Sequence, residues 1–143
     1  MSARLSGDRE AGFTLIELLV VMLILGILAA IAIPAFFNQR DKANDAQAKA
    51  AARTAQTAIE TYATEHGGSY AGADADALIA IEPTLVKTGD NAISVTNPTA
   101  TGYTVTSTSS KSHAFSITRA GGVVTFPCTP KGGGCTNTAD WSE

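Results

Sequence analysis

Apolar residues are concentrated near the start of the chain. Residues 18–37 (LLVVMLILGILAAIAIPAFF) contain 18 apolar side chains in 20 positions and no charged residue. At about 1.5 Å per residue, a helix of this length covers the roughly 30 Å hydrocarbon layer of a bilayer. The pattern therefore predicts a transmembrane helix.

Residues 38–66 continue as an alanine-rich stretch that contains neither proline nor glycine. Small and apolar side chains recur on one face with helical period; these are Ala48, Ala51, Ala55, Ile59, Tyr62 and Ala63. Gly67 and Gly68 end the pattern, because glycine accepts the left-handed conformation found at helix ends. We therefore expect one helix over residues 13–66. Its amphipathic half, residues 38–67, packs on something outside the membrane.

Residues 68–143 have the composition of a small antiparallel sheet. Threonine, serine and valine alternate with larger apolar side chains, which predicts strands at 92–96, 102–108, 113–119 and 123–127. Gly121-Gly122 predicts a tight hairpin, and residues 75–81 predict a short helix. The expected core consists of Val105, Phe115, Ile117, Val124 and Phe126, facing Ala55, Ile59 and Tyr62. The predicted fold class is α+β, a long N-terminal helix packed on a small antiparallel sheet.

Charge and cysteine content limit which partners and which cellular location are expected. A net charge of −3 and a pI near 5.3 give no general attraction to nucleic acid, so no nucleic-acid partner is indicated. Cys128 and Cys135 lack the further ligands of a metal site, so they predict a disulfide. A disulfide implies an oxidising, extracytoplasmic location for the sheet region.

The sequence contains no recognised catalytic motif, and we expect neither an enzyme nor a cofactor. His66 is expected at a helix C-terminus and His113 on the surface at the start of a strand. Asp74, Asp76 and Asp90 are weak candidates for calcium, because exposed loop aspartates are usually only solvated. No resident metal is therefore predicted.

Glu17 stands out because an ionisable residue at the start of a transmembrane helix is costly and often functional. Two interpretations remain open: Glu17 either reaches the membrane surface without further role or pairs with a partner. A secretory signal peptide is a competing interpretation, since Ala30-Ile31-Ala32 resembles a small-x-small cleavage site. However, the region before it has no net positive charge, and the apolar run continues beyond that site to Phe37.

Residues 12–21 (GFTLIELLVV), followed by an apolar helix that contains Pro34, resemble the N-terminus of the type IV pilin and pseudopilin family. The resemblance implies that residues 1–12 are a leader peptide. A prepilin peptidase would cut between Gly12 and Phe13 and methylate the new amino group of Phe13. Residues 13–37 would then be the transmembrane and assembly helix. Independently of the resemblance, Pro34 predicts a kink because it lacks an N–H, and the low helix propensity of Gly26 and Pro34 predicts that the helix melts there on assembly.

The resemblance also implies how the subunits assemble. The carboxylate of Glu17 would neutralise the amino group of Phe13 in an adjacent subunit and set the axial register. The implied partners are other pilin subunits, including minor pilins, the prepilin peptidase, the bilayer, and a membrane platform with its cytoplasmic ATPase.

The expected function is therefore that of a type IV pilus subunit, made as a single-pass precursor in the cytoplasmic membrane with a cytoplasmic N-terminus. Lys and Arg are more frequent after the apolar run than before it, which by itself favours the opposite orientation. A type II secretion pseudopilin, which builds a short periplasmic rod, remains the first alternative. A binding module or enzyme held by a signal anchor is the second.

Overall fold

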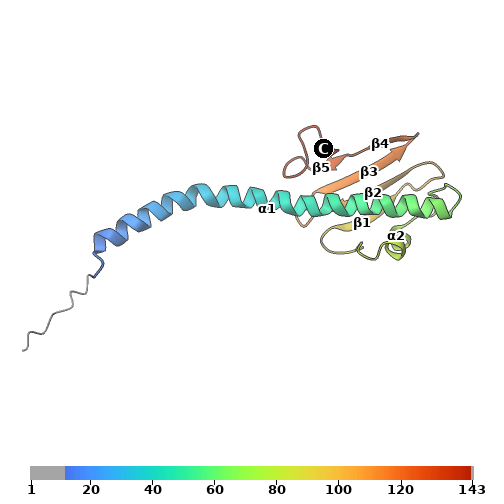
Figure 1. Cartoon of the computed structure of the whole chain (residues 1–143). Helices are drawn as coiled ribbons and strands as arrows, with labels where there is room; N and C mark the ends of the chain where they lie inside the picture. The colour runs from blue at the N-terminus through green and yellow to red at the C-terminus, as the bar shows by residue number, and fades with distance from the viewer. Residues whose placement is uncertain (1–11, 143) are drawn as a thin grey trace, which may run out of the picture. The chain divides into compact units, whose positions relative to one another are not determined.

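A computed structural model describes residues 12–142, so the expected leader, apart from Gly12, lies outside the described residues. The elements, in chain order, are α1 (Leu15–Glu65), α2 (Ala75–Ile81), β1 (Ala92–Thr96), β2 (Tyr103–Thr108), β3 (Ala114–Ala120), β4 (Val123–Thr125) and β5 (Cys128–Thr129). Figure 1 shows their course along the chain. The α+β class expected from the sequence is confirmed.

The chain divides into two compact units, Met1–Phe37 (the N-terminal unit) and Asn38–Glu143 (the C-terminal unit). In its described part, the N-terminal unit holds the first turns of α1, which stay helical through Gly26 and Pro34. This segment is long and apolar enough to cross a membrane, and none of its most apolar stretch is buried.

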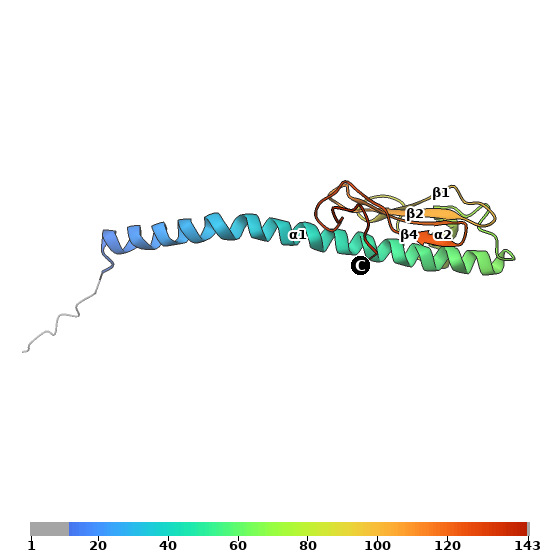
Figure 2. The ribbon, with the colours of Figure 1, turned by 90° about the horizontal axis from the view of Figure 1, so that it is seen from above.

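In the C-terminal unit, the remainder of α1 lies along one face of a five-stranded antiparallel sheet, seen edge-on in Figure 2. The strand order is β1-β2-β3-β4, and β5 pairs with β3. Gly121 and Gly122 connect β3 to β4 with φ angles of 59° and 80°. Two consecutive positive φ angles characterise the tight turn that suits hairpin twist, so the predicted hairpin is confirmed.

One expected strand is shorter than predicted. The sequence pattern suggests a strand over residues 123–127, but β4 ends at Thr125 and the chain pairs with β3 again only at Cys128. Pro127 has no N–H to donate to a ladder, which interrupts regular pairing at this point. Its carbonyl still accepts a hydrogen bond from the Ser116 N–H at 2.9 Å.

The core of the C-terminal unit forms where alanines of α1 meet the inner side chains of the sheet. Val105, Phe115 and Ile117 are fully buried, as predicted, and Ala55 and Ile59 are buried on the helix side. Alanine has a short side chain, so the backbone of α1 can approach the sheet closely. Val124, Phe126, Ala51 and Tyr62 are only partly buried at the margin of this core.

Trp141 is the largest fully buried side chain in the described part of the chain, although the pattern of strands does not predict it. Its ring meets those of Phe115 and Phe126 edge-on, at centroid distances of 5.9 and 5.4 Å. The indole N–H donates to the Ser116 carbonyl at 2.9 Å. The C-terminal segment is therefore part of the core.

Glu60 anchors α1 to the sheet by polar contacts. Its carboxylate accepts hydrogen bonds from the hydroxyls of Tyr70 and Tyr103, at 2.8 and 2.9 Å, and from the Arg119 guanidinium at 3.1 Å. Arg119 belongs to β3 and Tyr103 to β2. One side chain of α1 is thus bonded to two strands and to the loop before α2.

Asp45 provides a second, fully buried anchor. Its Oδ2 lies 2.7 Å from His113 Nδ1 and accepts the Gly134 N–H at 2.8 Å. His113 was expected on the surface, but only 15% of its side chain is exposed, because it contacts this carboxylate. A Cβ on Gly133 would collide with Asp45, and Gly133 also has a φ of 56°, so only glycine fits there.

Asp45→Asn should destabilise the C-terminal unit, by about 1–3 kcal/mol at pH 7, since it removes a buried, hydrogen-bonded charge. Burial raises the pKa of the Asp45 carboxyl, but the Gly134 N–H and His113 together lower it below its usual value. The stabilisation is therefore complete above the unfolded-state pKa of about 3.9 and is lost as pH falls through the lower native pKa. Thermal melts of the full chain in detergent, followed by Trp141 fluorescence, measure this effect.

Asp41→Asn is the matched control, because Asp41 pairs with Lys111 at 3.3 Å on the exposed surface. It should change the free energy of unfolding by less than about 1 kcal/mol. Equal losses in the two variants, or a loss for Asp45→Asn that does not shrink in acid, would contradict the role assigned to Asp45.

Candidate functional site

The helix α1 begins at a capping box made by Thr14 and Glu17. The Thr14 N–H and hydroxyl both donate to Glu17 Oε2, at 2.9 and 3.0 Å, and the Glu17 N–H donates to Thr14 Oγ1 at 3.3 Å. The sequence alone leaves the partner of Glu17 open. The spacing T-x-x-E immediately before an apolar run was the signal that identifies this cap.

The surface that follows the cap is apolar on every side. From Leu15 to Phe37 the large apolar side chains are 49–76% exposed, and Glu17 is the one charged residue of this segment. A helix that is hydrophobic all round is found in lipid or in a protein interior. This segment of α1 therefore needs a cover that the described residues of the N-terminal unit do not supply.

Glu17 lies beside a hollow on this apolar surface. The hollow is lined by Phe13, Ile16, Val20 and Val21 in addition to Glu17. Both side-chain contacts of Glu17 use Oε2. Within residues 12–142, Oε1 therefore has no hydrogen-bond donor and is available to one from outside the chain.

Gly12 and Phe13 precede the helix in an exposed stretch. Phe13 is 91% exposed, and the space around the missing side chain of Gly12 is open. A peptide bond in such a segment is accessible to a protease without unfolding of either unit. The structure places this bond one residue before the capping box.

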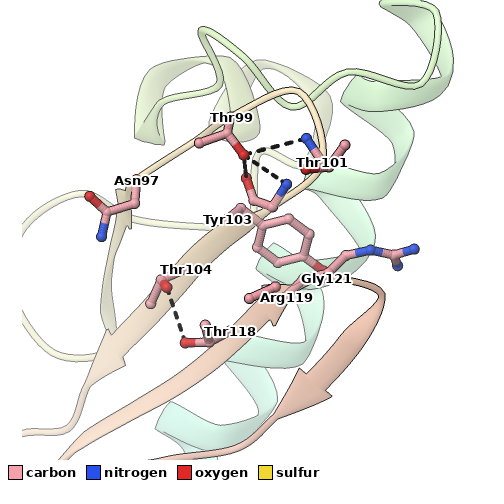
Figure 3. A pocket seen from close by; sticks show the side chains of 10 residues that line it. Asn97, Thr99, Thr101, Tyr103, Thr104, Thr118, Arg119 and Gly121 are labelled. Carbon is pink, nitrogen blue, oxygen red and sulfur yellow. Dashed lines mark hydrogen bonds between the residues drawn. The ribbon is translucent and has the colours of Figure 1, made fainter.

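A shallow groove in the C-terminal unit is a second concave site, shown in Figure 3. Threonine hydroxyls dominate its lining. Thr99 Oγ1 accepts the Gly102 N–H at 2.9 Å and so holds the loop before β2, while Thr104 and Thr118 bond each other across β2 and β3 at 3.0 Å. These hydroxyls are engaged in holding the loop and the sheet.

The groove lacks the groups that acid–base or nucleophilic catalysis requires. Its lining contains no histidine, cysteine or carboxylate. Arg119 is bonded to Glu60, and Tyr103 is a poor proton donor because burial, followed by the nearby Glu60 carboxylate, raises the pKa of its phenol. We therefore assign the groove no catalytic chemistry.

The remaining predicted sites belong to the C-terminal unit. Cys128 and Cys135 form a disulfide that closes the loop next to β5. Asp74 caps α2 by accepting the Ala77 N–H at 2.8 Å, and Asp76 pairs with Lys87 at 2.6 Å. In the part of the chain that the structure describes, no three metal-binding side chains come together.

Comparison with known proteins places the apolar segment and the sheet in one family. Residues 7–33 match the family model described as the prokaryotic N-terminal methylation motif. The type IV wide pilus major component PilA4 of Thermus thermophilus is 37% identical over 129 residues, which cover 90% of this chain and 88% of that protein.

Two further relatives match a smaller share of the chain. The type IV narrow pilus major component PilA5 of Thermus thermophilus is 38% identical over 78 residues, or 45% of this chain and 67% of that protein. The type II secretion system core protein G of Pectobacterium carotovorum is 37% identical over 57 residues, or 40% of this chain and 36% of that protein. No solved structure matches the chain.

The likeness to PilA4 extends over nearly the whole chain, and the methylation motif coincides with the exposed apolar segment that begins at Phe13. These relatives are structural proteins, and the match with PilA4 is long enough to include residues of both units. The chain belongs to the type IV pilin and pseudopilin family, as a structural subunit and not an enzyme.

Proposed function

We propose that this chain is a subunit of a type IV pilus, processed after Gly12 and polymerised through the N-terminal part of α1 into an extracellular filament. The observation that carries the proposal is the apolar surface from Leu15 to Phe37, which is exposed on every side and interrupted only by Glu17. The C-terminal unit has its own buried core. The apolar segment is therefore free to serve in assembly.

A prepilin peptidase would remove residues 1–12 and methylate the amino group of Phe13. The exposed stretch at Gly12 and Phe13 supports this step, because the bond is accessible before the helix begins. Cleavage there leaves Thr14 and Glu17 in the mature chain. The helix therefore keeps its capping box after processing.

The new amino group of Phe13 would pair with Glu17 of an adjacent subunit. A lone charge in an apolar filament core is strongly unfavourable, whereas an amine and a carboxylate together are tolerated. Glu17 Oε1, which has no donor among the described residues, is the atom suited to receive it. This pairing fixes the register of one subunit on the next.

Before assembly the same apolar surface would lie in the cytoplasmic membrane, with the N-terminus in the cytoplasm and the C-terminal unit outside. The disulfide between Cys128 and Cys135 supports an oxidising location for that unit. A membrane platform with its cytoplasmic ATPase would extract the subunit into the growing fibre. Lipid contacts are then exchanged for contacts with other pilin subunits, minor pilins included, around the same side chains.

A type II secretion pseudopilin is the second candidate. The match with the core protein G of Pectobacterium carotovorum favours it, but that match covers only 40% of this chain. The match with PilA4 continues through the sheet, which favours the pilus. Long surface filaments distinguish a pilus from the short periplasmic rod of a pseudopilus.

The mass of the chain purified from its native host tests processing directly. We expect a chain that begins at Phe13 and carries one additional methyl group on its amino terminus, as read by intact mass and N-terminal fragmentation. A chain beginning near Ala32 would indicate ordinary secretion. A chain that retains the first residues would indicate a tethered domain, and either result would remove Glu17 from the mechanism.

Two substitutions separate the charge of Glu17 from its capping role. Glu17→Gln keeps a side chain that can cap the helix but removes the charge, whereas Thr14→Ala weakens the cap and keeps the charge. We expect Glu17→Gln to be inserted and processed normally yet to form no filaments. Electron microscopy of sheared surface filaments and immunoblots of cell fractions measure both steps.

Thr14→Ala should still assemble, with a modest loss of helix stability of about 1 kcal/mol. Glu17→Ala should fail to assemble like Glu17→Gln. Normal filaments from the Gln variant, or equal failure of Thr14→Ala, would show that the charge pair is not what assembly requires.

The helix should lose order near Gly26 and Pro34 when the subunit enters the filament. Glycine and proline have the lowest helix propensities, at about 1 and 3 kcal/mol less favourable than alanine. A density map of the assembled filament shows whether the helix is ordered there. Continuous helical density through both residues would refute this prediction.

A further inference from the structure

The threonine-lined groove of Figure 3 lies at the end of the sheet where β1 ends and β2 begins. Residues 97–102 form one side of it, and β2, β3 and the turn at Gly121 form the other. Its volume is about 330 Å³, near the lower end of the range for small-molecule sites in proteins. The groove therefore has room for a small ligand or for the end of a longer one.

The side formed by residues 97–102 is held in place by its own hydrogen bonds. Thr99 Oγ1 accepts the Gly102 N–H at 2.9 Å, and the Thr99 N–H donates to the Gly102 carbonyl at 2.8 Å. A Cβ on Gly102 would lie 2.6 Å from the Arg119 carbonyl oxygen, so only glycine lets this loop approach β3 so closely. A loop that is already ordered loses little conformational freedom when a ligand binds.

Both sides of the groove carry hydrogen-bonding groups that the fold does not fully use. Asn97 and Thr101 are exposed, and within residues 12–142 neither the Asn97 amide nor the Thr101 hydroxyl has a hydrogen-bond partner. Thr104 and Thr118 share one hydrogen bond at 3.0 Å. One hydroxyl hydrogen of that pair is therefore available to a ligand, together with the groups of the loop.

The lining of the groove brings no uncompensated charge. Arg119 is the one charged residue among those that line it, and its guanidinium is bonded to Glu60 of α1 at 3.1 Å. The Tyr103 hydroxyl donates to the same carboxylate at 2.9 Å. A phosphate or an acidic peptide would find no free cation here, and a metal ion would find no carboxylate. The groove therefore suits a neutral, polar ligand.

The outer face of the sheet, which is turned away from α1, continues the chemistry of the groove. Alternate residues of a strand point to the same face. The strand register places hydroxyl side chains on this face in two adjacent rows, with Thr96, Thr104, Thr118 and Thr125 in one row and Ser94, Thr106 and Ser116 in the other. Within β1–β4 no residue at an outward position is charged. Since Thr104 and Thr118 also line the groove, the groove and the rows form one uncharged polar surface.

We propose that the groove is a binding site for a neutral carbohydrate, such as a hexose unit at the end of a glycan or polysaccharide. Sugar hydroxyls both donate and accept hydrogen bonds, as do the threonine hydroxyls and the Asn97 amide. Asn97 and Thr101 bind the sugar from the loop, and the Thr104 and Thr118 hydroxyls bind it from the sheet. The two hydroxyl rows extend the site for a longer chain of sugars.

One groove binds its sugar weakly. The Tyr103 ring is only 1% exposed, so the sugar has no open aromatic face on which to stack. A filament repeats the groove on every subunit, and several units of one polysaccharide can then be bound at once. Only this gain from repetition rests on the proposed function, because the groove itself belongs to the single subunit.

Binding is tested on the full chain in detergent, applied to a printed array of neutral disaccharides of glucose, galactose, mannose or N-acetylglucosamine. Their sialylated and sulfated counterparts are printed beside them. We expect a neutral disaccharide to be bound, and its acidic counterparts to be bound no better, because the groove offers no free cation. Filaments sheared from the host should bind the same sugar at least tenfold more tightly than the single subunit.

Two variants remove the polar groups of the groove and keep its backbone. N97G/T101V removes the amide and the hydroxyl of the loop, and glycine suits position 97, where φ is 51°. T104V/T118V replaces both partners of one hydrogen bond by side chains of the same shape, which costs little stability. Each variant should bind the disaccharide roughly tenfold more weakly, since it removes hydrogen bonds to the sugar.

T106V/S116A is the matched control. It removes the neighbouring hydroxyl pair, bonded at 2.8 Å, which lies outside the lining of the groove. This variant should bind disaccharides like the wild type. Thermal melts followed by Trp141 fluorescence show whether each variant is folded.

The inference would be overturned if the folded wild-type chain bound no neutral sugar or clearly preferred the acidic ones. Equal binding by the wild type and both groove variants would overturn it as well, and so would an equal loss in the control. Each of these results leaves the proposed function intact, because processing and filaments are measured separately. A chain that binds the sugar through the groove, but is neither processed nor assembled in its host, would support the inference and overturn the proposed function.

Discussion

The constraint on which the molecule depends is the apolar surface from Leu15 to Phe37. Burying one large apolar side chain is worth roughly 1.5–3 kcal/mol, and 16 such side chains are exposed on this segment. The sum, on the order of tens of kcal/mol, far exceeds the marginal stability of a typical domain. This segment must therefore be covered, and we propose that lipid covers it before assembly and other subunits cover it afterwards.

The fold of the C-terminal unit does not depend on what covers the apolar segment. Its core is formed by α1 residues beyond Asn38, the sheet and the C-terminal Trp141. Asp45 and Glu60 add polar anchors, and both find their partners within the same unit. Lipid can therefore be exchanged for protein around the N-terminal part of α1 without loss of a contact inside the C-terminal unit.

Local patterns in the sequence predicted the helix, most strands and the hairpin because each depends on residues close in the chain. Gly67 and Gly121-Gly122 act within a few residues, and the alternation around Val105 and Ile117 marks their inward face. Asp45 and His113 could not be paired in this way, because they are 68 residues apart and meet only when the sheet folds onto α1. Trp141 lies in a tail with no strand pattern, so its burial depends entirely on tertiary contacts.

The Thr14–Glu17 cap differs from these long-range contacts, because its signature lies within four consecutive residues and can be recognised in the sequence. It also reconciles the two interpretations of Glu17 that the sequence left open. A carboxylate at the third position of a helix is stabilised by the exposed N–H groups and by the helix dipole, so it is tolerated there before assembly. Because one oxygen serves the cap and the other has no donor in the described chain, the same residue can begin the helix and still accept an amine from a neighbour. The cap thus offsets, in the monomer, the energetic cost of placing a charge beside an apolar segment. The pairing that we propose stabilises the carboxylate further, and only on assembly.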